Sequence, residues 1–150
     1  MNIVILGCGR VGSTFARLMY HEGHHVTIID QQSEAFRRLG TKYKGGRIIG
    51  NGIDEDVLRK AGIENAQVFI AVTQGDNRNI MAAQMARHLF QVQTVVARIY
   101  DPIRADRYRQ LGIVTLCTTT IASGLLRDFV STNAWGLAKD YSQEYLAANV

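Results

Sequence analysis

The sequence has little proline, little cysteine and no long hydrophobic run. One proline and 14 glycines in 150 residues exclude a proline-rich linker, and no breaker-rich stretch divides the chain. The two cysteines, Cys8 and Cys117, lie far apart and outside any CxxC spacing, which favours reduced thiols over a disulfide. No segment approaches the ~20 apolar residues of a membrane-spanning helix, and the apolar run over residues 3–6 is too short for a signal peptide.

The composition is typical of a single globular domain with a sizeable core. The chain is 47% hydrophobic and 20% charged, which excludes a disordered tail. Its length leaves no room for a nucleotide-binding domain followed by a full substrate domain. The net charge of +4 is compatible with an anionic partner. Lysine and arginine are scattered, however, and no arginine-rich arm appears, so no nucleic acid is expected as a partner.

Short β-branched runs alternate with amphipathic segments, which is the pattern of repeated βα units around a parallel sheet. Several runs are apolar at consecutive positions, as expected for strands that helices cover on both faces. We therefore predict an α/β fold with a Rossmann-like, doubly wound, parallel six-stranded sheet. The six strands are expected over residues 3–6, 26–29, 47–49, 68–72, 94–99 and 114–116.

Helix boundaries are marked by capping residues. Asp54 precedes a helix that ends at Gly62, where a left-handed residue is needed. Asp76 begins a longer helix, and Asp101 caps another whose first residue is the proline. Gly40 ends the helix between the second and third strands.

The apolar pattern changes after residue 118. Residues 121–130 predict a helix that is apolar over much of its circumference, and residues 133–150 predict a helical extension with aromatic side chains. A compact sheet domain over residues 1–118 needs neither segment to close its core. We therefore expect residues 119–150 to cover a neighbouring protomer or another partner, the alternative being a helix that packs on the chain's own core.

A glycine-rich loop directly follows the first strand and begins the first helix. Gly7 permits the tight turn, Gly9 lets a phosphate approach the backbone, and Gly12 lets the helix pack close to the sheet. Free amides at the helix N-terminus attract the phosphate anion. The pattern predicts a phosphate-binding loop that comprises Gly7, Cys8, Gly9, Arg10, Val11 and Gly12.

An acidic residue ends the second strand. Asp30 lies 18 residues after Gly12, close to the spacing at which a carboxylate accepts the ribose hydroxyls. Gln31 follows it rather than an arginine, which favours NAD(H) or a plain adenine nucleotide over NADP(H). The alternative is that Asp30 only caps the following helix.

Further polar residues follow the other strands, at the edge where open α/β sheets bind ligands. Arg10 is a long cation beside the phosphate loop, where it can contact a terminal phosphate, or it faces solvent. The adenine-side candidates are Asn51 and Gly52, and the diphosphate-side candidates are Thr73, Gln74 and Asn79. Turn formation alone also explains these residue types.

Longer stretches of the chain resemble one family. They are VILGCGRVGS, HEGHHVTIID, IIGNGIDEDVLRKAGIENAQVFIAVTQGDNRNIMAAQMA, VVARIYDP and LGIVTLCTTTIASGLL, and together they cover roughly residues 1–130. The chain resembles the N-terminal RCK domain, also called the KTN or Trk-type NAD-binding domain, of bacterial potassium-uptake regulatory subunits.

This resemblance implies a regulatory function without hydride chemistry. Such domains bind NAD(H) or ATP, ADP or AMP, and they gate a potassium channel or transporter. They form homodimers through an exchanged crossover helix, here residues 121–130, and the dimers assemble into octameric rings. The location implied is the cytoplasm, at the inner face of the membrane through the membrane partner. By position, the resemblance adds Arg98 to the ligand-binding residues.

Two other functions remain open. The first is a fragment of an NAD-dependent oxidoreductase, although the chain supplies no evident acid or base beside a nicotinamide, so no enzyme is expected. The second is a nucleotide-responsive redox sensor that binds nucleic acid. The cluster His21, Glu22, His24 and His25 lies at a turn with no zinc-helix spacing, so no metal site is expected.

Overall fold

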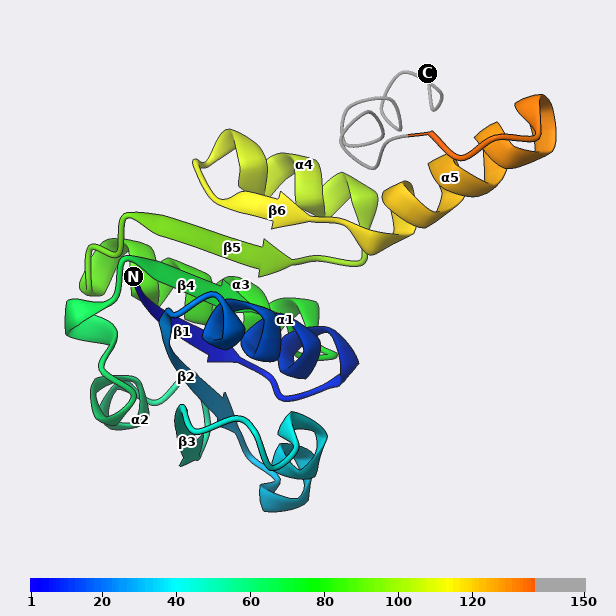
Figure 1. Ribbon diagram of the computed structural model, residues 1–150. Coiled ribbons are helices and arrows are strands. Elements are labelled where there is room, and N and C mark those ends of the chain that lie inside the picture. Colours follow the sequence, from blue (N-terminus) through cyan, green and yellow to red (C-terminus); the bar gives the residue numbers. More distant parts are fainter. Residues whose placement is uncertain (137–150) are drawn as a thin grey trace.

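The computed structural model of the chain describes residues 1–136 and contains one parallel sheet of six strands (Figure 1). The strand order is β3-β2-β1-β4-β5-β6, and every neighbouring pair is parallel. This order confirms the predicted Rossmann-like, doubly wound fold. The strands are β1 (Asn2–Leu6), β2 (His25–Asp30), β3 (Gly46–Ile49), β4 (Val68–Ala71), β5 (Thr94–Arg98) and β6 (Val114–Leu116).

The connections between strands are helical, and their capping residues act as predicted. The Asp54 carboxylate accepts the Asp56 N–H, and the Asp101 carboxylate accepts the N–H groups of Ile103 and Arg104. Gly62 has φ +83°, the left-handed conformation that ends a helix. The helices are α1 (Arg10–His21), η1 (Ser33–Leu39), α2 (Glu55–Lys60), η2 (Ile63–Asn65), α3 (Asp76–Gln84), η3 (Met85–Leu89), α4 (Pro102–Gln110) and α5 (Thr118–Thr132).

Two helices differ from the expected type. The segment before Gly40 is a 3₁₀ helix, η1, and the helix that begins at Asp76 changes into a single π turn, η3, before Phe90. Phe90 N–H accordingly bonds to the carbonyl of Met85, five residues earlier.

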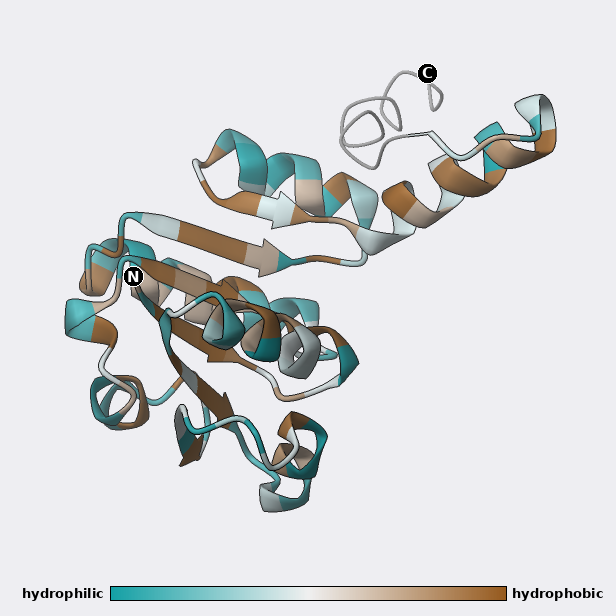
Figure 2. Cartoon of the chain, viewed as in Figure 1, coloured by the Kyte–Doolittle hydropathy of each residue, from teal (hydrophilic) through white to brown (hydrophobic). Residues whose placement is uncertain are grey.

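Two hydrophobic clusters cover the two faces of the sheet. On one face, Ile3, Ile5 and Ile28 pack against Ala16 of α1 and Leu39 of η1. The other face carries the larger cluster, in which Val4, Leu6, Phe69 and Val95 pack against α2, α3 and α4. Residues of β1, β2 and β4 therefore alternate between two covered faces, and the brown strands in Figure 2 show the continuous apolar runs that result.

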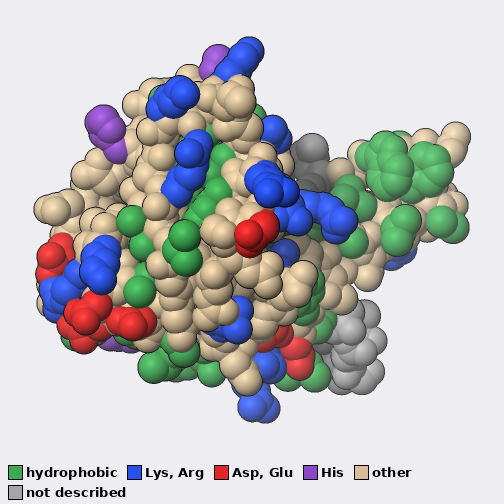
Figure 3. Space-filling model, turned by 90° about the horizontal axis from the view of Figure 1, so that it is seen from below, with side chains coloured by type: hydrophobic (Ala, Val, Ile, Leu, Met, Phe, Trp, Pro, Cys, Tyr) green, Lys and Arg blue, Asp and Glu red, His purple; other side chains and the backbone are tan. Residues whose placement is uncertain are grey.

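The last helix projects away from the sheet beyond β6 (Figure 1). Hydrophobic side chains gather on this arm in Figure 3, and Val130 is 83% exposed. The predicted helix over residues 121–130 is confirmed as part of α5. The predicted extension is not helical where the structure describes it, because left-handed Asn133 ends α5 and residues 133–136 form no helix. Residues 137–150 of the extension lie outside the described residues.

Candidate functional site

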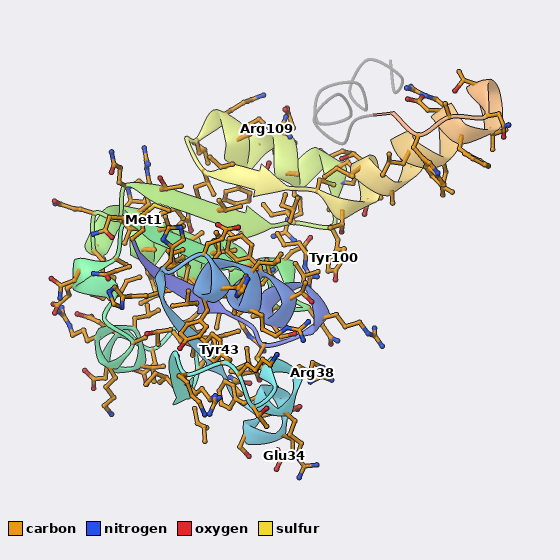
Figure 4. All side chains as sticks on the ribbon, in the orientation of Figure 1. Met1, Glu34, Arg38, Tyr43, Tyr100 and Arg109 are labelled. Carbon is orange, nitrogen blue, oxygen red and sulfur yellow. The ribbon has the colours of Figure 1, made fainter. Side chains whose placement is uncertain are left out.

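A cleft of about 430 Å³ lies at the carboxyl ends of the strands, where the strand order reverses between β1 and β4. Its wall is formed by the loop from β1 to α1, the end of β2 with η1, and the ends of β4 and β5. Figure 4 shows Tyr100 and Arg38 on opposite sides of the loop between β1 and α1. The cleft brings together most of the predicted site residues, namely Gly7, Cys8, Gly9, Arg10, Val11, Asp30, Gln31, Gly52, Thr73, Gln74 and Arg98.

Two glycines of the loop are required by the fold itself. Gly7 has φ +104°, and its N–H donates to the carbonyl of Ile29 at 2.8 Å. A Cβ at Gly12 would stand 1.9 Å from the carbonyl oxygen of Gly7. Gly12 does not line the cleft; it allows α1 to pack closely against the end of β1, as the loop pattern predicts.

Gly9 has no such structural reason to be glycine. Its φ is −74°, and a Cβ there would meet no atom within 4 Å. The open space lies at the N-cap of α1, where the N–H groups of Arg10, Val11 and Gly12 have no carbonyl of their own helix to bond. The backbone of Gly9 is therefore open to the cleft at the N-terminus of α1.

Asp30 joins the glycine loop to the end of β2. Its Oδ2 accepts the Cys8 N–H at 2.7 Å, and its Oδ1 accepts the Gln32 N–H at 2.9 Å. The capping alternative is not observed, because Gln32 is the N-cap of η1 and no side chain caps that helix. A carboxylate has about four acceptor positions, so capacity remains for ribose hydroxyls.

Asn79 is buried behind the cleft wall. It does not line the cleft, contrary to its predicted place beside the diphosphate. It is fully buried, and its Oδ1 accepts the N–H and the hydroxyl of Thr73 at 2.9 and 2.7 Å. Its Nδ2 donates to the carbonyls of Thr73 and Arg98 at 2.9 and 2.8 Å. Asn79 therefore holds the ends of β4 and β5 together and has no exposed surface with which to contact a ligand.

Asn51 also lies outside the cleft wall. Its Oδ1 accepts the Ile53 N–H at 3.4 Å, so the side chain belongs to the turn after β3. Of the two adenine-side candidates, the structure places Gly52 in the cleft wall and leaves Asn51 on the exposed turn.

Arg98 is the most buried charged side chain of the cleft, with 8% of its surface exposed. Its Nη2 donates to the carbonyl of Thr73 at 2.7 Å, and its guanidinium carbon lies 4.6 Å from the centre of the Tyr100 ring. Its Nε is buried and has no hydrogen-bond partner among the described residues.

Several residues of the cleft wall were not predicted. They are Leu6, Gln32, Ala35, Arg38, Val72, Arg78 and Tyr100. The position of Arg78 could have been predicted from the sequence. It follows Gly75 and Asp76 in the first turn of α3, as Arg10 follows the glycine loop in α1. No pattern in the sequence indicates that Arg38 and Tyr100 line the cleft, since their positions depend on the path of η1 and on the turn after β5.

The two cysteines do not provide a reactive thiol. Both cysteines are free and buried, and burial raises the pKa of the Cys8 thiol to about 11, with the Asp30 carboxylate adding to the rise. Within residues 1–136 no cluster of three or more His, Cys, Asp or Glu side chains is arranged to hold a metal ion. Over the same residues, no helix combines the length and the apolar character needed to cross a bilayer.

A doubly wound parallel sheet, a glycine-rich loop after β1 and an acid at the end of β2 define a Rossmann-type domain. The chain belongs to the TrkA-N domain family, whose profile matches residues 3–119. The Trk system potassium uptake protein TrkA of Streptomyces coelicolor is 50% identical over 141 residues, which cover 93% of this chain and 63% of that protein. A Pyrococcus abyssi homologue is 40% identical over 68% of this chain and 45% of its own length. The matched part of the chain thus spans between 22% and 63% of the length of the curated relatives.

Solved structures share the fold at low sequence identity. A Kef C-terminal domain from Shewanella denitrificans, in an AMP-bound form, has a TM-score of 0.75 at 20% identity and covers 99% of this chain and 93% of that one. GsuK, solved with ADP and as a channel bound to NAD, has a TM-score of 0.74 at 23% identity. The two GsuK matches cover 89% and 88% of this chain and 34% and 23% of theirs.

Proposed function

We propose that the chain is a nucleotide-sensing regulatory domain of a potassium channel or transporter. The observation that carries the proposal is the open space at Gly9, which leaves the N-terminus of α1 free for a phosphate with Asp30 beside it. Family membership supports the potassium assignment, because the curated relatives are named as Trk potassium uptake proteins.

The proposed ligand is NAD(H) or an adenine nucleotide (AMP, ADP or ATP). These molecules share an adenosine and at least one phosphate, and the related structures were solved with AMP, ADP and NAD. Asp30 accepts the ribose hydroxyls, the amides of the glycine loop bind the first phosphates, and Gly52 lies on the adenine side. Arg10, Thr73 and Gln74 face the rest of the phosphate chain.

The composition of the cleft supports sensing over catalysis. Its described lining contains no histidine, lysine or glutamate, and the single carboxylate, Asp30, already accepts two backbone N–H groups. The Cys8 thiol is not an activated nucleophile or base, because burial raises its pKa to about 11 rather than lowering it toward neutral pH. Hydride transfer to or from a substrate needs a positioned acid or base, which these groups do not supply.

The proposed assembly is a homodimer, and dimers form the octameric ring beneath the membrane partner. The face of the sheet that carries α1 has no helix over β5 and β6 in the described chain, and Val114 there is 57% exposed. The apolar side of α5 projects free of its own domain, so a second copy can supply the missing cover. The proposed location is the cytoplasm, at the inner membrane face.

A hydrogen-bonded connection links the cleft to α5. Tyr100 lies in the cleft wall, its N–H donates to the Asp76 carboxylate at 2.9 Å, and its carbonyl accepts the Thr119 hydroxyl at 2.7 Å. Thr119 is in the first turn of α5. A ligand that favours one position of Tyr100 would therefore also favour one position of α5, which is how binding can shift the assembly between two states.

The test is titration of the purified 150-residue chain with AMP, ADP, ATP and NADH. The proposal predicts saturable binding and no consumption of NADH when carbonyl substrates are added. Steady NADH oxidation would support the oxidoreductase alternative, and retention on DNA at physiological salt would support the nucleic-acid alternative. The absence of binding to every adenine nucleotide would contradict the proposal.

A further inference from the structure

A second cavity lies at the opposite end of the sheet from the nucleotide cleft. It has a volume of about 1320 Å³ and opens between the C-terminal half of α1, the first residues of β2 and the loop that leads from η1 into β3. His25 begins β2 in this cavity and Asp30 ends β2 in the cleft, so the two sites are roughly 17 Å apart. Their described linings share no residue, and the cavity is therefore a separate site.

Basic side chains surround this second cavity. They are Arg17, His21, His24, His25, Lys42 and Lys44. The described lining contains no aspartate or glutamate, so the cations have no counter-charge within the cavity. The histidines are those of the turn between α1 and β2, which the proposed nucleotide site does not use.

The fold accounts for some of these groups and not for others. His21 is in the last turn of α1, where the helix dipole favours a cation, and His24 Nε2 lies 3.9 Å from the Glu22 carboxylate. Arg17, Lys42 and Lys44 have no such explanation. All three are exposed, and within residues 1–136 none of them has a hydrogen-bond or ion-pair partner. Three unpaired cations at one cavity indicate an anionic ligand.

The loop that carries the two lysines is fixed to the sheet. Tyr43, labelled in Figure 4, is buried between them, its hydroxyl donates to the Val26 carbonyl at 2.7 Å, and its ring centre is 5.0 Å from that of Tyr20. A Cβ at Gly45 would stand 2.4 Å from the same carbonyl oxygen, so the loop follows β2 closely. The fold therefore holds both lysines beside α1.

The cavity also has apolar and aromatic lining residues. They are Leu18, Tyr20, Val26, Leu39 and Tyr43. Leu18 is 56% exposed although it follows the cation Arg17 in α1. The volume exceeds the about 300–1,000 Å³ of sites that enclose a small molecule. A wide site with a basic rim and an exposed leucine suits a phosphate group that carries an apolar chain better than a small soluble anion.

We propose that this cavity binds the phosphate headgroups of anionic phospholipids at a membrane surface. Arg17, Lys42 and Lys44 supply the charge, and Leu18 supplies the apolar contact. The choice of a lipid follows from charge complementarity, because a cytoplasmic membrane face is negatively charged and attracts clustered basic residues. The inference goes beyond nucleotide binding and does not depend on it, and it agrees with the proposed location at the inner membrane face.

The experiment is sedimentation of the purified 150-residue chain with phospholipid vesicles at about 0.15 M salt. The chain should bind vesicles that contain phosphatidylglycerol and should not bind vesicles of phosphatidylcholine alone. The double substitution Lys42→Gln/Lys44→Gln should weaken this binding at least about tenfold, because each lysine near an anionic membrane adds to the attraction. Leu18→Ser should weaken it about fivefold by removing the apolar contact.

Lys60→Gln/Arg107→Gln is the matched control, because it removes the same charge from exposed positions on α2 and α4 outside the cavity. It should leave vesicle binding within about twofold. Equal weakening by both double variants would overturn the proposal in favour of general charge attraction. Binding of inorganic phosphate or of polyglutamate that depends on Lys42 and Lys44, without vesicle binding, would also overturn it.

ADP titration of the same proteins separates this proposal from the proposed function. Lys42→Gln/Lys44→Gln should keep the wild-type ADP affinity and thermal melt, because neither lysine lines the nucleotide cleft. A wild-type chain that binds ADP but no anionic vesicle would contradict the lipid site alone. Vesicle binding without ADP binding would contradict the nucleotide-sensing function alone.

Discussion

At the scale of single residues, Asp30 combines a structural role with a proposed role in binding. Its carboxylate holds the N–H groups of Cys8 and Gln32, and we propose that it also accepts ribose hydroxyls. Asp30→Ala should weaken AMP, ADP, ATP and NADH alike by about 1–3 kcal/mol, because every one of them loses the same acceptor. Calorimetry with each nucleotide measures this loss.

Asp54→Ala is the matched control for that substitution. Asp54 also accepts a backbone N–H, that of Asp56, but it caps α2 away from the cleft wall. It should cost about 1 kcal/mol of folding free energy and leave nucleotide affinity unchanged. Selective loss of only one nucleotide in Asp30→Ala would show that Asp30 does not contact the shared ribose.

Cys8 makes the stability of the domain sensitive to alkaline pH. Burial raises the pKa of its thiol from 9.0 to about 11 in the folded chain. Because the folded pKa is the higher one, the contribution is fully present below about pH 9 and is lost as pH rises through about 11. We expect a fall of roughly 2 kcal/mol in the free energy of unfolding over this window, measured by urea titration.

Cys8→Ala isolates this contribution from that of Tyr43, whose buried hydroxyl also has a raised pKa and acts in the same direction. The variant should start less stable at pH 8 and decline less steeply above pH 9. An identical decline in both proteins would mean that Cys8 ionises as freely in the folded chain as in the unfolded one.

At the scale of elements, α5 is the segment whose exposed surface its own domain does not explain. We predict that Val130→Asp weakens dimer formation at least about tenfold, because a charge would enter a face that a second copy covers. The folding free energy should change little, since Val130 is 83% exposed in the single chain. Sedimentation over a range of protein concentrations measures the effect.

Leu18→Asp provides the comparison, because Leu18 is also an exposed apolar residue on a helix, 56% exposed on α1, and not on α5. It should leave sedimentation unchanged. A dimer that tolerates Val130→Asp, or one that Leu18→Asp disrupts equally, would place the interface elsewhere.

The elements themselves followed from local signals in the sequence. Asp54 with Gly62 and Asp101 with its proline fix helix ends through backbone groups only a few residues away, so these ends were predictable. The π turn of η3 was not, because it depends on the packing of Ala86 and Phe90 against the sheet rather than on residue type.

At the scale of the whole molecule, the glycine loop and Asp30 were predictable because their spacing encodes their geometry. Asn79 was misplaced, since a polar residue in a strand-end motif gives no sign of whether it faces a ligand or ties two strands together. Arg38 and Tyr100 were missed because only the assembled sheet brings η1 and the end of β5 to the same cleft.

Gly9 offers the most direct test of the central claim, that the N-terminus of α1 binds a nucleotide phosphate. Gly9→Ala adds a methyl group with no atom of the chain within 4 Å, so folding should lose no more than about 1 kcal/mol. Gly12→Ala, by contrast, brings a Cβ to 1.9 Å from a carbonyl oxygen and should cost roughly 1–3 kcal/mol or more.

The decisive measurement is therefore ADP binding to the wild-type chain and to Gly9→Ala, with a thermal melt of each. The wild-type chain should bind one ADP with saturation, and Gly9→Ala should stay folded but bind at least about tenfold more weakly. A folded Gly9→Ala that binds ADP as tightly as the wild-type chain would contradict the claim.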